Sequence, residues 1–318
     1  MVMVYVLFIV GLFLLVKGAN WVVDSASSIA KLLGVSSLVI GLTVVAFGTT
    51  LPELVVNLFA AFAGSNEVIF GNVIGSYIAN ILLVLGIIIM IGRVRIARET
   101  VWEEIPFAFL AVFVLFVLTG NLINGGKEFL TRNDGLILLS LFFIFLYYIF
   151  QMTKDKRKSF DVSMIVDRKA WKIVSKLVAG VVGIYFGGKW VVNGAVSIAE
   201  LWGMSEYLIS ATIIAVGTSL PELVVGIVAV IKKNADLAVG NIIGANVLNI
   251  CWVLGVVPLI APLAIPTYIG FDIGVMFLAT LLLFIFVFVG KKGELSKTEG
   301  IVFLLFYGLY LWFVIWRG

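Results

Sequence analysis

The chain is dominated by long apolar runs that are separated by short stretches of charged or turn-forming residues. These runs are long enough to cross the hydrocarbon core of a bilayer, which requires roughly 20 apolar residues. Apolar and polar residues do not alternate along them, which favours membrane-spanning helices over the strands of a membrane β-barrel. We predict an all-α integral membrane protein with ten transmembrane helices, at 2–22, 37–62, 68–92, 104–122, 134–153, 171–192, 206–231, 237–260, 265–290 and 299–316.

Composition supports this interpretation and narrows the chemistry. Hydrophobic residues make up 62% of the chain and charged residues 13%, which is unlike a soluble domain. Cys251 is the single cysteine, so an internal disulfide is excluded, and the sequence contains no histidine. Proton transfer would therefore depend on carboxylates, and no cofactor is expected.

The distribution of basic residues predicts the orientation. With the N-terminus outside, 18 of the 22 Lys and Arg residues fall on the inner side and 4 on the outer side, as the positive-inside rule requires. We therefore interpret the net positive charge as a topology signal and not as a nucleic-acid-binding surface. The chain is expected to be a multi-pass protein of the cell membrane that is functional as a monomer, with both termini outside.

The charged segment 154–170 is the only long charged connection in the sequence. We predict that it is a cytoplasmic linker between two five-helix domains, at 1–153 and 171–318.

An internal repeat relates the two halves. Residues 18–86 align with 187–255 without a gap, and 32 of these 69 positions are identical. Each half has an odd number of helices, so the second half enters the membrane from the opposite side. Inverted repeats of this kind are typical of secondary transporters, whose substrate site lies near the midplane where interrupted helices meet. A conserved packing unit would explain the shared glycines, but not a glutamate beside a proline in each half.

Each repeat carries a polar motif within an apolar helix, "GTTLPE" at 48–53 and "GTSLPE" at 217–222. Pro52 and Pro221 lack an amide hydrogen, so each is predicted to break its helix one turn earlier. The carbonyl groups of 46–48 and 215–217 would then be free to face protein, water or an ion. A protonated glutamate that bonds a neighbouring helix is the alternative interpretation, but an ionisable residue inside a membrane indicates a functional site by default.

The oxygen atoms near these breaks suit a hard cation such as Ca²⁺ or Na⁺. Soft sulfur and imidazole ligands are missing from the motifs, which argues against zinc or copper. The hydroxyl and carboxylate side chains are those of Thr49, Thr50, Glu53, Thr218, Ser219 and Glu222.

The next helix of each repeat adds amide and hydroxyl groups at a spacing of four, which places them on one helix face. They are Asn72, Ser76 and Asn80 in the first repeat and Asn241, Ala245 and Asn249 in the second. Asn80 and Asn249 are the better ligand candidates, whereas Asn72 and Asn241 have the alternative role of bonding the neighbouring backbone. The glycines Gly71, Gly75, Gly240 and Gly244 are expected to allow close contact with the broken helices.

These paired motifs, "GTTLPE" with "GNVIGSYIAN" and "GTSLPE" with "GNIIGANVLN", resemble the two α-repeats of the sodium/calcium exchanger family. On this chain the α-repeat motifs are 41–86 and 210–255. The resemblance implies exchange of Na⁺ for Ca²⁺ by alternating access, with the first and sixth helices sliding across a rigid core. It also implies an ion site between helices 2, 3, 7 and 8. The implied ligands are Glu53, Glu222, Thr49, Thr50, Thr218, Ser219, Ser76, Asn80, Asn249 and the carbonyls of Ala46 and Ala215.

Two positions depart from the family pattern. Position 249 is Asn where some relatives have Asp, which leaves two carboxylates, enough to neutralise one Ca²⁺. Position 245 is Ala where the family usually has Ser, so a Na⁺ beside Thr218 and Glu222 is expected to have one ligand fewer. Asp24 and Asp272 are expected at helix ends, outside the ligand set.

Three other functions compete with Na⁺/Ca²⁺ exchange. The nearest alternative is an H⁺/Ca²⁺ antiporter in which Glu53 and Glu222 carry the protons. A passive cation channel is less favoured, because channels usually gain symmetry by oligomerising and this chain contains its own twofold repeat. An intramembrane enzyme is disfavoured because the sequence offers no catalytic dyad.

Overall fold

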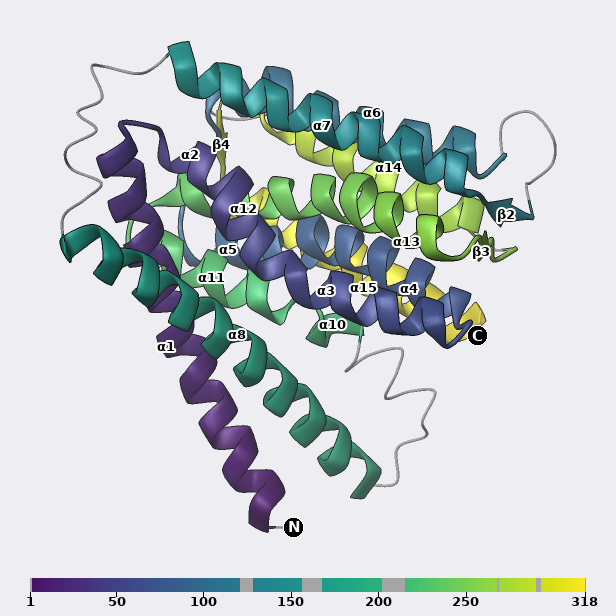
Figure 1. Ribbon diagram of the computed structural model, residues 1–318, viewed down its shortest axis with the longest axis horizontal. Helices are drawn as coiled ribbons and strands as arrows, with labels where there is room; N and C mark the ends of the chain where they lie inside the picture. Colours follow the sequence, from purple (N-terminus) through teal and green to yellow (C-terminus); the bar gives the residue numbers. More distant parts are fainter. Residues whose placement is uncertain are drawn as a thin grey trace.

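The computed structural model of the protein describes residues 2–120, 128–155, 168–201, 215–267, 269–289 and 293–317. It is a bundle of helices with two short strand pairs (Figure 1). The first half, in which η marks π-helical segments, contains α1 (Val2–Leu33), α2 (Ser37–Ile40), η1 (Gly41–Val45), α3 (Ala46–Phe62), α4 (Asn66–Ile78), η2 (Ala79–Leu85), α5 (Gly86–Ile91), β1 (Val94–Arg95), η3 (Thr100–Glu104), α6 (Ile105–Leu118), β2 (Phe129–Leu130) and α7 (Arg132–Asp155). The second half contains α8 (Arg168–Leu201), α10 (Ala215–Gly217), α11 (Leu220–Ile231), α12 (Ala235–Leu248), η6 (Asn249–Val253), α13 (Leu254–Ile260), β3 (Leu263–Ala264), α14 (Ile269–Phe286), β4 (Glu294–Leu295) and α15 (Lys297–Arg317).

The helices agree with the predicted membrane fold. Within the described residues, nine helical segments are long and apolar enough to span a bilayer, and α11 is a shorter apolar helix. The predicted span 206–231 begins in 202–214, outside the described residues, so α10 and α11 are its described part. Most of the predicted linker 154–170 also lies outside them, and the domain boundaries therefore stay a prediction.

Two predicted helix ends are wrong. The first helix continues to Leu33 instead of ending at 22, and α8 continues to Leu201 instead of ending at 192. The polar stretch after 22 does not stop α1, because the hydroxyls of Ser27 and Ser28 donate to helix carbonyls one turn earlier, each at 2.7 Å. Buried small residues such as Ala26 also continue the packed face of α1. Figure 1 shows α1 and α8 side by side at the edge of the bundle, and the two helices are in extensive contact.

The longer α1 changes the setting of Asp24. This residue lies inside the helix, so the prediction that it lies at a helix end is wrong. Its carboxylate forms ion pairs with Lys176 of α8 at 3.0 Å and with Lys232, which follows α11, at 2.6 Å. Asp24 therefore connects α1 to both α8 and the second repeat, and it stays outside the ligand set.

Matching turns close the α3–α4 and α11–α12 hairpins. The amide of Ser65 donates to the carbonyl of Ala60 at 2.9 Å, and the amide of Asn234 donates to the carbonyl of Ala229 at 2.9 Å. These residues are equivalent in the two repeats, so the sequence repeat extends to the hydrogen bonds of the turns.

Two antiparallel strand pairs connect the halves of the chain. β1 pairs with β4 and β2 pairs with β3, so each pair joins a connection of the first half to one of the second. Arg95 in β1 also forms an ion pair with Glu294 in β4 at 2.7 Å. The sequence patterns did not predict these strands, because each is only two residues long.

The predicted close packing of the motif glycines is confirmed in the second repeat. A Cβ built at Gly240 of α12 would lie 2.6 Å from the Leu38 carbonyl oxygen, and one at Gly244 would lie 2.7 Å from the Leu42 carbonyl oxygen. At Gly71 and Gly75 of α4, no described atom lies within 4 Å of the built Cβ. Among the described residues, α12 therefore packs against the backbone of α2 and η1, while Gly71 of α4 is exposed; the residues equivalent to Leu38 and Leu42, at 207 and 211, lie outside the described residues.

Candidate functional site

Glu53 lies on the buried face of α3, one turn after the buried Thr49 and Thr50. Pro52 lies inside this helix, so the predicted break in the first repeat is wrong. A proline removes one backbone hydrogen bond, but in a membrane protein neighbouring helices can hold the remaining turns in place. The irregularity comes earlier, because the π-helical segment η1 leads directly into α3 at Ala46.

The second repeat has the predicted break. Helix α10 ends at Gly217 and α11 begins at Leu220, with Thr218 and Ser219 between them. Glu222 falls in the first turn of α11 and is fully buried. Backbone amides at a helix N-terminus favour negative charge, so this position suits a carboxylate better than the middle of a helix does.

Side chains from the two repeats contact each other across the pseudo-twofold axis. The Thr49 hydroxyl lies 3.2 Å from both the Asn241 amide oxygen and the Ala46 carbonyl oxygen and can donate to either. The hydroxyls of Ser76 and Thr218 lie 3.2 Å apart. The motifs of the two repeats therefore meet in one region between α3, α4, α11 and α12.

The two glutamates belong to this region. Glu53 and Glu222 lie close enough for their charges to interact, and Thr49 lies against Glu222. Two like charges in a low-dielectric interior repel each other, and each costs several kcal/mol to bury without a partner. A divalent cation held between them would turn this repulsion into attraction.

Asn80 and Asn249 lie in the two equivalent π-helical segments, η2 and η6. Segments of this kind often occur at functional sites. The Asn80 amide donates to the Asn246 amide oxygen at 3.0 Å, and the Asn246 amide donates to the Tyr77 carbonyl at 3.4 Å. Asn246 was missed at the sequence level because its equivalent in the first repeat is Tyr77 and a comparison of the repeats selects only shared residues.

Many polar atoms of this region are buried without a hydrogen-bond partner in the described part of the chain, although buried polar groups are normally paired. They include carboxylate, hydroxyl and amide oxygens, which are the ligands of hard cations. These side chains are Thr50, Glu53, Asn57, Asn72, Asn80, Ser219, Glu222 and Asn249.

The remaining candidates are placed as follows. Ala46 is buried at the start of α3, and Ala245 is buried on α12. Only the backbone of Ala215, in α10, is described. Among the described residues, Asn241 accepts a hydrogen bond from the Thr49 side chain and has no backbone partner. Asn57 is an unexpected member of the region, and the signal that could have identified it is its spacing of four from Glu53.

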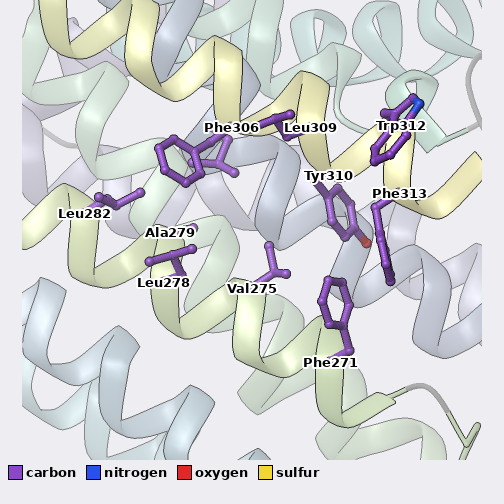
Figure 2. A pocket seen from close by; sticks show the side chains of 11 residues that line it. Phe271, Val275, Leu278, Ala279, Leu282, Phe306, Leu309, Tyr310, Trp312 and Phe313 are labelled. Carbon is purple, nitrogen blue, oxygen red and sulfur yellow. The ribbon is translucent and has the colours of Figure 1, made fainter.

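An apolar groove lies apart from this region. A groove between α14 and α15 is lined by apolar side chains, including Phe271, Leu278, Phe306 and Leu309 (Figure 2). Tyr310 is the one hydroxyl-bearing residue in the described lining. Both helices are candidate membrane spans, and the described lining of the groove lacks the set of oxygen ligands that a cation requires.

Comparisons with known proteins agree with this geometry. Residues 3–151 and 173–316 match the family model described as sodium/calcium exchanger protein. The chain is 38% identical to the protein CaxA of Alkalimonas amylolytica over 307 residues, covering 93% of this chain and 94% of that protein. It is 32% identical to the sodium/calcium exchanger MaX1 of Methanosarcina acetivorans, covering 96% and 97% of the two chains.

A solved structure also matches over almost the whole chain. The sodium-calcium exchanger NCX_Mj, from a crystal soaked with 10 mM Na⁺ and no Ca²⁺, superposes with a TM-score of 0.84 at 31% identity. The match covers 97% of this chain and 98% of that chain. These matches confirm the predicted ten-helix membrane fold with two inverted repeats.

Proposed function

The chain belongs to the sodium/calcium exchanger family, and from this membership we propose that it is a secondary active antiporter that exchanges Na⁺ for Ca²⁺ across the membrane. Membership places the protein among transporters and not among enzymes. The ions are then its transported substrates and not resident cofactors.

The observation that carries the proposal is the pair of buried carboxylates contributed by equivalent positions of the two repeats. Glu53 and Glu222 together carry the charge that neutralises one Ca²⁺. Because neither side chain has an ion pair with a described Lys or Arg, a transported cation would be their natural counterion. Exchange with Na⁺ requires that several monovalent ions replace one divalent ion at the same oxygens.

The proposed ligand set combines carboxylate, hydroxyl, amide and carbonyl oxygens, as hard cations require. It consists of Glu53, Glu222, Thr49, Thr50, Thr218, Ser219, Ser76, Asn80, Asn249 and the carbonyls of Ala46 and Ala215. The buried and unpaired state of several of these side chains supports the assignment.

Alternating access would be provided by α1 and α8. These helices pack closely on each other, since a Cβ built at Gly18 would lie 2.7 Å from the Gly180 carbonyl oxygen. Their buried side chains also form one cluster with side chains of α2, η1, α11 and α12, which is the surface that the pair would slide across. A pair that is packed in this way can slide as a unit across the helices that hold the ions.

Uptake of radioactive Ca²⁺ into proteoliposomes tests the proposed function. We expect uptake when the vesicles are loaded with Na⁺ and diluted into Na⁺-free buffer, because the outward Na⁺ gradient drives Ca²⁺ inward. Uptake that follows an outward proton gradient instead would identify an H⁺/Ca²⁺ antiporter. Uptake without either gradient would identify a passive channel.

Restoring a hydroxyl at position 245 is expected to strengthen Na⁺ binding. The Ser76–Thr218 contact indicates that each serine position faces the threonine of the opposite repeat, so Ala245 is expected beside Thr49 and not beside Thr218. An Ala245→Ser variant should gain one oxygen ligand, worth on the order of 1 kcal/mol or about fivefold in apparent Na⁺ affinity. The Na⁺ dependence of Ca²⁺ efflux measures this effect. A half-saturating Na⁺ concentration that stays the same or rises would show that position 245 does not contact Na⁺.

The orientation can be tested by cysteine labelling in intact cells. We propose that both termini lie outside and that the linker 154–170 is cytoplasmic. A Ser159→Cys variant should therefore react with a membrane-impermeant thiol reagent only after permeabilisation. As the matched control, Glu67→Cys at the exposed start of α4 should react in intact cells. Native Cys251 is buried, so it should contribute little background. Labelling of position 159 in intact cells would show that the orientation is the opposite of the one proposed.

A further inference from the structure

Asn57 is buried but does not belong to the proposed ligand set. Its side chain is 0% exposed, and neither its amide nitrogen nor its amide oxygen has a hydrogen-bond partner among the described residues. Burying an amide without a partner costs free energy, so a side chain of this kind calls for an explanation beyond packing. The equivalent position in the second repeat is Gly226, so the repeat does not explain it.

A second unpaired amide lies at the same level of the α3–α4 hairpin. Asn57 lies seven residues before Gly64, and Asn72 lies seven residues after Ser65. The two helices are in contact and run antiparallel from this turn, so both residues lie at one height. Both side-chain polar atoms of Asn72 are also buried and without a partner among the described residues.

Asn57 and Asn72 lie about one helical turn from the level of Glu53. Glu53 and Ser76 form the next pair at equal distances from the turn, and four residues of helix rise about 6 Å. Because Asn57 follows Glu53 by four residues, the two side chains lie on the same face of α3. The amides of Asn57 and Asn72 therefore lie between the proposed ion site and the α3–α4 turn.

Among the described residues, the face of α4 beside these amides is more exposed than its equivalent on α12. Gly71 is exposed, Asn72 and Gly75 are half-buried and Ser76 is buried, so exposure falls steadily toward the ion site. No described atom lies within 4 Å of a Cβ built at Gly71 or Gly75. In the second repeat, the equivalent residues of α12 are all buried. A cation that approaches Glu53 along this face of α4 would pass Asn72 and Asn57.

We propose that Asn57 and Asn72 form an outer amide site, a transient binding site for Ca²⁺ and Na⁺ on the path to the carboxylates. Their amide oxygens can replace part of the hydration shell of a hard cation. The site carries no charge, so it holds a cation less tightly than the glutamates do, as rapid passage requires. This inference rests on the proposed function, because it assumes that cations reach Glu53 and Glu222.

The test uses Asn57→Leu and Asn72→Leu in full-length protein. Leucine has a similar size and removes the unpaired amide, which is neutral or stabilising in a buried position, so Tm should stay the same or rise. The initial rates of Na⁺-driven Ca²⁺ uptake and efflux at subsaturating Ca²⁺ should both fall about fivefold or more, the factor for one lost neutral contact. Equilibrium binding of radioactive Ca²⁺ to purified protein should change by less than about twofold, because a site on the path alters rates and not the final affinity. Asn66→Ala, on the same hairpin, is the matched control and should behave like wild type.

Each outcome decides the proposal. Wild-type rates in both leucine variants would refute the outer amide site, and a large loss of equilibrium binding would place the amides in the carboxylate site instead. Should the leucine variants fail to fold, Asn57→Asp keeps the size and adds charge. It should lower the half-saturating Ca²⁺ concentration, and an unchanged value would overturn the proposal. Wild-type protein without Na⁺-driven uptake would refute the proposed function itself, which is a separate result.

Discussion

Replacement of either Glu53 or Glu222 by glutamine is expected to abolish Ca²⁺ transport while the protein still folds and inserts. Each variant keeps the size of the side chain and removes one of the two buried charges that would balance Ca²⁺. Removing one partner of a buried charge pair typically costs 3–5 kcal/mol, which corresponds to a loss of roughly two to four orders of magnitude in Ca²⁺ affinity. Na⁺-driven Ca²⁺ uptake into proteoliposomes and equilibrium Ca²⁺ binding measure the two parts of this prediction.

Glu67→Gln provides the matched control for the glutamate variants, because Glu67 is exposed in the first turn of α4. It should transport Ca²⁺ at the wild-type rate. Measured without ions, Tm of Glu53→Gln and Glu222→Gln should equal or exceed that of wild type, since the substitution relieves repulsion between like charges. Near-normal exchange in either variant would refute the proposed ion site, and a large drop in Tm would show a structural role instead.

The sequence was sufficient to select the proposed ligands that both repeats share. Glu53 and Glu222 stand out because a carboxylate beside a proline recurs in two apolar helices. The structure brings them together as the repeat implied. The length of α1 could not be predicted in this way, because serines and Asp24 resemble a helix end. Only in the folded protein do the serine hydroxyls donate to helix carbonyls. Only there is the Asp24 carboxylate paired with Lys176 and Lys232.

Differences between the repeats could also not be predicted from a comparison of their sequences. Asn57 was missed because the second repeat has Gly226 at that position and a comparison of the halves selects what they have in common. Gly71 and Gly240 occur in the same "GN" motif but differ in exposure, because Gly71 is exposed and Gly240 is buried.

Substitution of Gly240 by alanine is expected to destabilise the protein strongly and to stop exchange. The added methyl group would lie 2.6 Å from the Leu38 carbonyl oxygen and 3.1 Å from the Leu42 amide nitrogen, which are backbone atoms. Backbone cannot move aside as a flexible side chain can, and overpacking of this kind costs roughly 1–3 kcal/mol or more. The contact also supports η1, which leads into α3 and its proposed ligands Ala46, Thr49 and Glu53. Tm in detergent and Na⁺-driven Ca²⁺ uptake should therefore both fall.

The repeat supplies the matched control for this variant at the equivalent glycine. A methyl group at Gly71 would meet no described atom within 4 Å, and alanine is the better helix former by roughly 0.8–1.0 kcal/mol. Gly71→Ala should therefore leave Tm unchanged or raise it, although it makes the same substitution as Gly240→Ala at the equivalent position of the motif. If both variants lower Tm equally, the two helices have equivalent environments and the asymmetry between α4 and α12 is refuted. A fall in Tm for Gly240→Ala alone would show that the close contact of α12 with α2 and η1 holds the second repeat against the first. This arrangement brings Glu53 and Glu222 together.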